Sequence, residues 1–120
     1  MPAMTEHPRY AYKLLAPGDA KAFESLGYTN TTLDQIDGYI HLSTKAQLAE
    51  TFRRYYEQES WCLLLEIDLS TRTDIKWEPS RGGDLFPHIY GKLRTDDVER
   101  RWLLKADDVT PIELPDDLND

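Results

Sequence analysis

The sequence predicts an α+β fold in a single domain, built as a mixed, split β-sheet with flanking helices. The chain has 120 residues, which suits one hydrophobic core. Hydrophobic residues make up 40% and charged residues 30%, as expected for a folded globule. Segments with a period of two alternate with segments of helical spacing. Two successive predicted strands, at 74–78 and 87–93, have no helix between them, which favours a mixed sheet over a doubly wound one.

The N-terminal third is predicted to contain a strand, a short helix and an irregular segment. Residues 10–15 alternate large apolar with small or charged side chains, which is typical of a half-buried strand. Residues 17–26 carry apolar side chains at helical spacing, and the glycine that follows suits a left-handed helix end. Residues 28–35 are polar and rich in Thr and Asn, so we expect an irregular or edge segment.

The middle of the chain is predicted to contain a strand, a longer helix and a central strand. A brief strand at 39–42 leads into a helix from Thr44 to about residue 57. Thr44 and Gln47, three residues later, match a capping box. Residues 61–69 form an apolar run broken by two acidic residues, as expected for a strand buried on both faces.

The C-terminal third is predicted from its prolines, glycines and acidic residues. Proline ends strands or confines them to edges, adjacent glycines mark a loop, and acidic residues favour a helix start. The predicted elements are a strand at 74–78, a loop at 80–84, a strand at 87–93, a short helix at 95–101 and an edge strand at 109–114.

Length and composition also predict how the domain is bounded. We expect one domain at 10–114, between a flexible N-terminal segment at 1–9 and an acidic tail at 115–120 that is solvated. No apolar run approaches the roughly 20 residues that span a bilayer. The first residues lack a secretory signal, so a cytoplasmic location without membrane binding is expected.

Charge and cysteine content exclude several classes of function. The net charge is -8, and residues 96–120 carry nine acidic and three basic side chains. An acidic surface repels phosphate backbones, so broad nucleic-acid binding is not expected. Cys62 is the only cysteine, which excludes an internal disulfide, and its apolar neighbours predict a buried thiol.

The segment at 37–44 carries the first group of candidate functional side chains. His41 and Ser43 fall on one face of an extended strand, immediately before a predicted helix N-terminus that favours an anion. Both side chains can therefore converge on one ligand. Equally, His41 can bond to the backbone and Ser43 can cap the helix.

The segment at 77–91 carries the second group. Arg81 beside two glycines is typical of a phosphate or carboxylate clamp, although an ordinary tight turn has the same composition. Glu78 is either a carboxylate in apolar surroundings or an exposed strand residue. His88 and Tyr90 share a strand face, where they offer a titratable base and an aromatic ring, or simply pack in the core.

Taken together, these residues exceed what a small core requires, so a ligand pocket is expected where the two segments meet. His41 and His88 lack the short spacing of most metal ligands, so no metal site is predicted.

At these same residues the sequence resembles the DUF952 family, small bacterial proteins of unknown function. The family pattern reads approximately D-G-F-I-H-L-S-T and W-E-x-S-R-G-G-x-L-F-P-H-L-Y-G, and the matching segments here are DGYIHLST at 37–44 and WEPSRGGDLFPHIYG at 77–91. The departures are Tyr39 for Phe and Ile89 for Leu. The resemblance extends from about Tyr10 to Arg101.

This resemblance implies similarity to the ADP-ribosyltransferase fold, a split mixed sheet around a dinucleotide cleft. It implies NAD as a co-substrate, with His41 and Ser43 orienting the ribose and Tyr90 stacking on a base. Glu78 would stabilise the oxocarbenium-like centre or activate the acceptor, and Arg81 with its glycine loop would hold the diphosphate. The predicted catalytic residues are His41, Glu78 and His88; the predicted nucleotide-binding residues are Ser43, Thr44, Ser80, Arg81, Gly82, Gly83 and Tyr90.

Two alternatives stay open at this stage. The first is a phosphodiesterase with two histidines as acid and base, because residues 41–43 fit an H-x-[ST] pattern whereas residues 88–90 do not. The second is a ligand-binding or protein-binding module without catalysis. The expected partner in the leading hypothesis is a small-molecule nucleotide.

Overall fold

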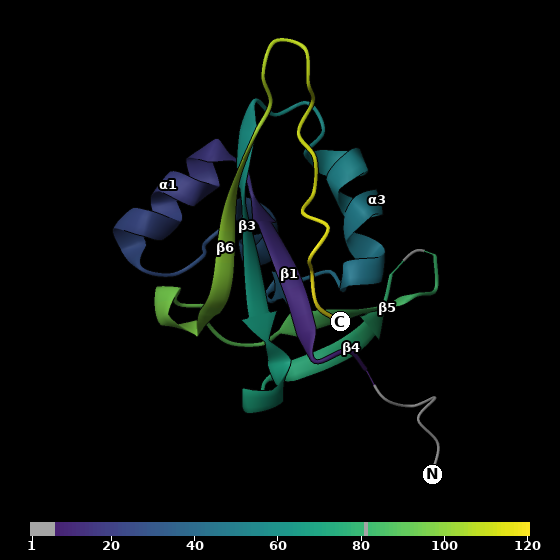
Figure 1. Ribbon diagram of the computed structural model, residues 1–120. Helices are drawn as coiled ribbons and strands as arrows, with labels where there is room; N and C mark the ends of the chain where they lie inside the picture. The colour runs from purple at the N-terminus through teal and green to yellow at the C-terminus, as the bar shows by residue number, and fades with distance from the viewer. Residues whose placement is uncertain (1–6, 81) are drawn as a thin grey trace.

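The computed structural model describes residues 7–80 and 82–120 and arranges them as two three-stranded sheets (Figure 1). The first sheet has the order β1 (Tyr10–Leu15), β3 (Trp61–Asp68), β6 (Val98–Lys105), and the second has the order β2 (Ile40–His41), β5 (Leu85–Ile89), β4 (Ile75–Pro79). A bridge between Tyr12 and Ser43 joins the sheets. The α+β class is confirmed. The expectation of a mixed sheet is wrong, because all strand pairs in the described part of the chain are antiparallel.

The two longer helices begin where the sequence signals indicate; the first also ends at its predicted residue, and the second ends about two residues earlier than predicted. Helix α1 (Pro17–Leu26) ends at Gly27, whose φ of 82° is the left-handed conformation that glycine adopts readily. Helix α3 (Lys45–Tyr55) begins with the predicted capping box between Thr44 and Gln47. The two helices cover opposite faces of the first sheet (Figure 1).

Each face of the first sheet buries its own layer of side chains, which explains the uninterrupted apolar sequence of β3. The first layer lies against α1 and the second sheet; its fully buried members include Leu15, Phe23, Leu65, Ile67 and Ile89. The second layer lies against α3 and the C-terminal segment; it includes Tyr12, Leu48, Leu64, Ile112 and Leu118. Cys62 is fully buried in this second layer, as predicted.

A helix was missed in the segment predicted to be irregular. Helix α2 (Thr32–Asp37) is short, and the side chain of Thr31 accepts a hydrogen bond from the backbone of Asp34 at its start. Gly38 ends it with a φ of 81°. Its six residues give too little helical periodicity to recognise in a polar sequence. The helix places two aspartates beside the second sheet.

The predicted helix at 95–101 and the predicted edge strand at 109–114 are both wrong. The acidic residues Asp96 and Asp97 lie in a single 3₁₀ turn (Thr95–Asp97), after which the chain becomes β6. Strand β6 pairs with residues 61–67 of β3, so its ladder hydrogen bonds outweigh the local capping signal. After β6, residues 106–120 form neither strand nor helix.

The C-terminal segment packs on the first sheet, in contrast to the solvated end that was expected (Figure 1). Leu118 is buried, and the backbone of Asn119 exchanges hydrogen bonds with the hydroxyl of Tyr12. That hydroxyl also contacts the buried Glu66 at 2.8 Å, and Glu66 accepts from Arg100. The tail therefore covers a polar cluster within the second core layer.

Candidate functional site

His41 and His88 lie side by side because their strands pair in one register. They are directly opposite each other across β2 and β5, and their ring centroids are 5.3 Å apart. Strand alternation puts both rings on one face of the second sheet, while Ile40 and Ile89 point to the core. The juxtaposition of the two predicted segments is thus observed at these two histidines.

Helix α2 contributes two carboxylates that hold the His41 ring. Nδ1 of His41 lies 2.6 Å from Oδ1 of Asp34, and Nε2 lies 2.9 Å from Oδ2 of Asp37. The same Oδ1 of Asp34 accepts a hydrogen bond from the backbone N–H of His41. The imidazole ring is therefore held at both nitrogens.

Lys13 lies behind Asp34 and is buried with it. Their side chains are 6% and 7% exposed, and Nζ of Lys13 lies 2.7 Å from Oδ2 of Asp34. Burial opposes ionisation of Asp34, but hydrogen bonds from His41 and the charge of Lys13 outweigh it and lower the pKa of Asp34. Burial lowers the pKa of Lys13, while Asp34 opposes that shift. We regard the pair as ionised, because Asp34 keeps several donors.

His88 has a carboxylate partner of its own at the margin of the site. Its Nδ1 lies 2.7 Å from Oε1 of Glu78, and the hydroxyl of Tyr90 donates to the same oxygen at 2.7 Å. The hydrogen bonds from His88 and Tyr90 lower the pKa of Glu78, and the bond to Glu78 raises the pKa of Tyr90 to about 12. When Nδ1 donates to Glu78, Nε2 of His88 is left as an acceptor.

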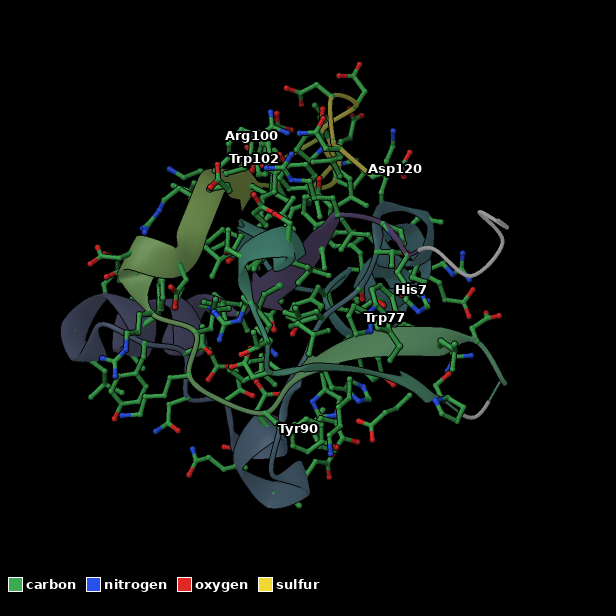
Figure 2. The ribbon with its side chains drawn as sticks, turned by 90° about the horizontal axis from the view of Figure 1, so that it is seen from below. His7, Trp77, Tyr90, Arg100, Trp102 and Asp120 are labelled. Atoms are coloured by element: carbon green, nitrogen blue, oxygen red, sulfur yellow. The ribbon has the colours of Figure 1, made fainter. Side chains whose placement is uncertain are left out.

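Tyr39 covers both histidines. Its ring centroid lies 4.2 Å from that of His88, 4.8 Å from that of His41 and 5.3 Å from that of Tyr90. Figure 2 shows Tyr90 on the opposite side of the β4–β5 ribbon from Trp77 and His7, which stack on each other. The aromatic group of Tyr39, His41, His88 and Tyr90 therefore belongs to one face of the second sheet.

Tyr39, His41 and His88 border a cavity of about 720 Å³ between the second sheet, β1, α2 and α3. Cavities of roughly 300–1,000 Å³ are typical of small-molecule sites. The part of the lining that we call its polar end is the contacting group Lys13, Asp34, Asp37, Tyr39, His41 and His88; other lining residues include Leu14, Ala16, Leu48, Tyr55 and Tyr56. Asp19 also lines it, so three carboxylates face one ammonium group among the described lining residues.

The other predicted site residues are placed differently from one another. Ser43 and Ser80 line the cavity, and the hydroxyl of Ser43 lies 2.9 Å from that of Thr51. Thr44 caps α3 and lies at a separate, shallower depression. Glu78 and Tyr90 do not line the cavity. Glu78 contacts His88 and Tyr90 contacts Tyr39, and these two partners do line it.

The predicted glycine loop turns between β4 and β5. Gly83 has a φ of 91°, and its N–H donates to the carbonyl of Ser80. Gly82 and Gly83 are exposed. Arg81 lies outside the described residues, so its predicted role as a clamp stays a prediction.

Sequence reasoning missed Lys13 and Asp34, which complete the polar end of the cavity. Each had a signal that could have identified it. Lys13 is the one charged residue of an otherwise apolar strand, on the face shared with Ala11 and Leu15. Asp34 follows Thr31 by three residues, which is the spacing of a helix start.

The comparisons with known proteins identify the family. A model of the family described as "Protein of unknown function (DUF952)" matches residues 16–101, so the chain belongs to this family. It is similar to the crystal structure of protein CC0527 from Caulobacter crescentus, with 32% identity, a TM-score of 0.77, and coverage of 87% of this chain and 93% of that chain. The solution structure of CC0527 gives 32% identity, a TM-score of 0.73, and coverage of 86% and 90%. No curated protein matches the chain.

These neighbours support the α+β fold and give no support to the ADP-ribosyltransferase resemblance, since their descriptions name no activity or ligand. In the described residues, no group of three His, Cys, Asp or Glu side chains is arranged to hold a metal ion. Within the same residues, none of the helices has the length and apolar character needed to cross a bilayer.

Proposed function

We propose that the cavity binds NAD or a related ADP-ribose compound and that the protein transfers or hydrolyses its ADP-ribosyl group. The observation that carries this proposal is the polar end of the cavity, where two carboxylate-backed histidines lie beneath the ring of Tyr39. A planar base can stack on an aromatic ring, and a ribose hydroxyl can bond to an imidazole.

The charge of the cavity favours the nicotinamide-ribose half of NAD as the buried part. The nicotinamide ring of NAD is cationic, and breaking its glycosidic bond develops positive charge at the ribose. Asp34, Asp37 and Asp19 outnumber Lys13 among the described lining residues. Preorganised carboxylates stabilise such charge more in a cavity than in water.

In this proposal His41 orients the ribose, and His88 acts as the general base. The bond between the ribose and nicotinamide breaks, and its electron pair leaves with neutral nicotinamide. Water or an acceptor hydroxyl then bonds to the ribose and gives its proton to Nε2 of His88. Glu78 holds the tautomer of His88 from behind, so it acts through that histidine. The diphosphate contact expected at Arg81 is part of the same proposal.

The test is a thermal-shift titration with NAD, nicotinamide riboside and ADP-ribose, followed by an assay of nicotinamide release. A ligand at 100 times its Kd stabilises a protein by about 2.7 kcal/mol. We expect NAD to stabilise the wild type and to stabilise His88→Ala much less. His7→Ala is the matched control, because His7 stacks on Trp77 across the sheet from the cavity. No response of the wild type to any of the three compounds would contradict the proposal.

A two-histidine phosphodiesterase is the second candidate, and one observation favours it. His41 and His88 are neighbours across a strand pair, each with a carboxylate at Nδ1, which suits an acid and a base. The carboxylates of the cavity oppose a phosphate, so we rank it second. Turnover of a 2′,3′-cyclic nucleotide without a response to NAD would reverse this order. Tight binding of NAD without turnover would instead indicate a non-catalytic module.

A further inference from the structure

On one edge of β2, the backbone N–H and carbonyl of His41 form hydrogen bonds with side chains instead of with another strand. The N–H of His41 donates to Oδ1 of Asp34 at 3.1 Å, and its carbonyl accepts from Nζ of Lys13 at 3.0 Å. Lys13 and Asp34 also contact each other at 2.7 Å. The three residues form a closed network around one residue of a two-residue strand.

Stability does not readily explain this network. Lys13 lies between Ala11 and Leu15 on a core-facing side of β1, and its strand partner is Leu65. Burying an ion pair there costs desolvation free energy that the mutual attraction seldom exceeds, and apolar replacements of similar volume are often as stable. A buried pair is better explained by the geometry that it imposes on a neighbour.

The neighbour on which the geometry acts is the His41 ring. One carboxylate oxygen of Asp34 bonds to both the backbone N–H and Nδ1 of His41, which fixes the position and the rotation of the ring together. The other oxygen, Oδ2, accepts no well-oriented hydrogen bond from the described residues, so the charge of Lys13 is its compensation. Without Lys13 the buried carboxylate would be uncompensated.

We propose that Lys13 and Asp34 are positioning residues that hold Nδ1 of His41 protonated and leave Nε2 as its ligand-facing atom. Asp37, which meets Nε2 at 2.9 Å and is 35% exposed, occupies that position in the ligand-free protein and yields it to a ribose hydroxyl. Only the identity of this ligand rests on the proposed function. The proton on Nδ1 is a property of the protein alone.

The first experiment measures the ring-nitrogen shifts of His41 by ¹⁵N NMR in the ligand-free protein. We expect a protonated Nδ1 in the wild type and in Asp37→Asn, which keeps the Asp34 contact. Asp34→Ala removes the acceptor beside Nδ1, so the proton should move from Nδ1 to Nε2, which still faces Asp37. Unchanged shifts in Asp34→Ala, or an equal change in Asp37→Asn, would overturn the proposal.

A second variant keeps the test decisive if Asp34→Ala does not fold. The Lys13→Met/Asp34→Ala double variant removes both buried charges, and it should show the same proton signature at Nε2. Lys13→Met alone should lower the unfolding midpoint more than Lys13→Met does in the Asp34→Ala background, because it leaves one buried charge. If Lys13→Met lowers the unfolding midpoint equally in both backgrounds, the proposed role of Lys13 is wrong.

The ligand arm uses NAD with the same variants. Asp34→Ala should weaken NAD binding by about tenfold or more, as expected when a charged hydrogen bond is lost, while His7→Ala leaves it unchanged. If the wild type does not bind NAD, the proposed function fails, but the tautomer measurement still decides the positioning roles. If NAD binds equally to wild type and Asp34→Ala, the positioning roles fail and the proposed function stands.

Discussion

Removing the hydroxyl of Tyr12 tests whether the C-terminal segment is part of the folded domain. The Tyr12 side chain is 1% exposed, and its hydroxyl contacts Glu66 and both backbone groups of Asn119. A hydrogen bond to a charged group contributes about 1.5–3 kcal/mol. The backbone of Asn119 is near the surface, so water can replace part of its bonds. We therefore expect Tyr12→Phe to lower the free energy of unfolding by about 2–3 kcal/mol.

Urea denaturation followed by circular dichroism measures this loss, and a thermal melt should show a midpoint lower by roughly 6–15 °C for a domain of this size. Tyr10→Phe is the matched control, because Tyr10 lies at the more exposed end of the same strand. It should change stability by less than about 0.5 kcal/mol. A loss in Tyr12→Phe no larger than in the control would refute the structural role of the hydroxyl.

The same variant has a defined pH dependence. Hydrogen bonds from Arg100 are the main cause that lowers the pKa of Glu66, with Tyr12 and Asn119 contributing. A lowered carboxyl pKa in the fold gives stability that is present above the unfolded value of about 4.3 and is lost as pH falls through the folded value. The difference between Tyr12→Phe and the wild type should therefore narrow below about pH 4.

Three further predictions concern the glycines, the helix cap and the thiol. Gly38→Ala should destabilise by about 1–2 kcal/mol because of its positive φ, whereas Gly18→Ala within α1 should stabilise slightly, and paired urea titrations measure both. Thr44→Ala removes the capping box of α3 and should lower the free energy of unfolding by about 0.5–2 kcal/mol, whereas Thr44→Ser should keep most of the stabilisation from the cap. Equal losses of stability in the two variants would contradict the role of the cap. Burial raises the pKa of Cys62 to about 11, so a thiol reagent should label it in urea and leave the native protein unlabelled at pH 8.

The elements that the sequence predicted well are those with strong local signals. The strand at Tyr10–Leu15 and the helix at Pro17–Leu26 agree with the predicted bounds, because period, proline and glycine all indicate the same boundaries. The C-terminal third was predicted poorly because its structure depends on distant partners. Strand β6 forms where β3 offers a free edge, and Ile112 and Leu118 are buried by a sheet formed largely from earlier residues.

The candidate site was predicted only in part, because some of its residues matter through contacts with distant parts of the chain. His41 and His88 were identified from their side-chain types, and antiparallel pairing brings them together as supposed. Asp34 and Lys13 were missed because their importance comes from burial and mutual contact, which a single sequence does not display. Glu78 was selected as a candidate from its side-chain type, and its position behind His88 depends on the β4–β5 register.

The small bridge between Tyr12 and Ser43 has a consequence for how the cavity can form. It lies where β1 of the first sheet meets the segment that follows His41, and with the bond from Lys13 to the carbonyl of His41 it holds Lys13 beside the second sheet. The residues that line the cavity are supplied by both sheets, including Lys13 from the first and His88 from the second. Neither sheet alone contains the cavity, and partial unfolding of either one would abolish it. Ligand binding would accordingly report the integrity of the whole domain, and any ligand would stabilise both sheets together.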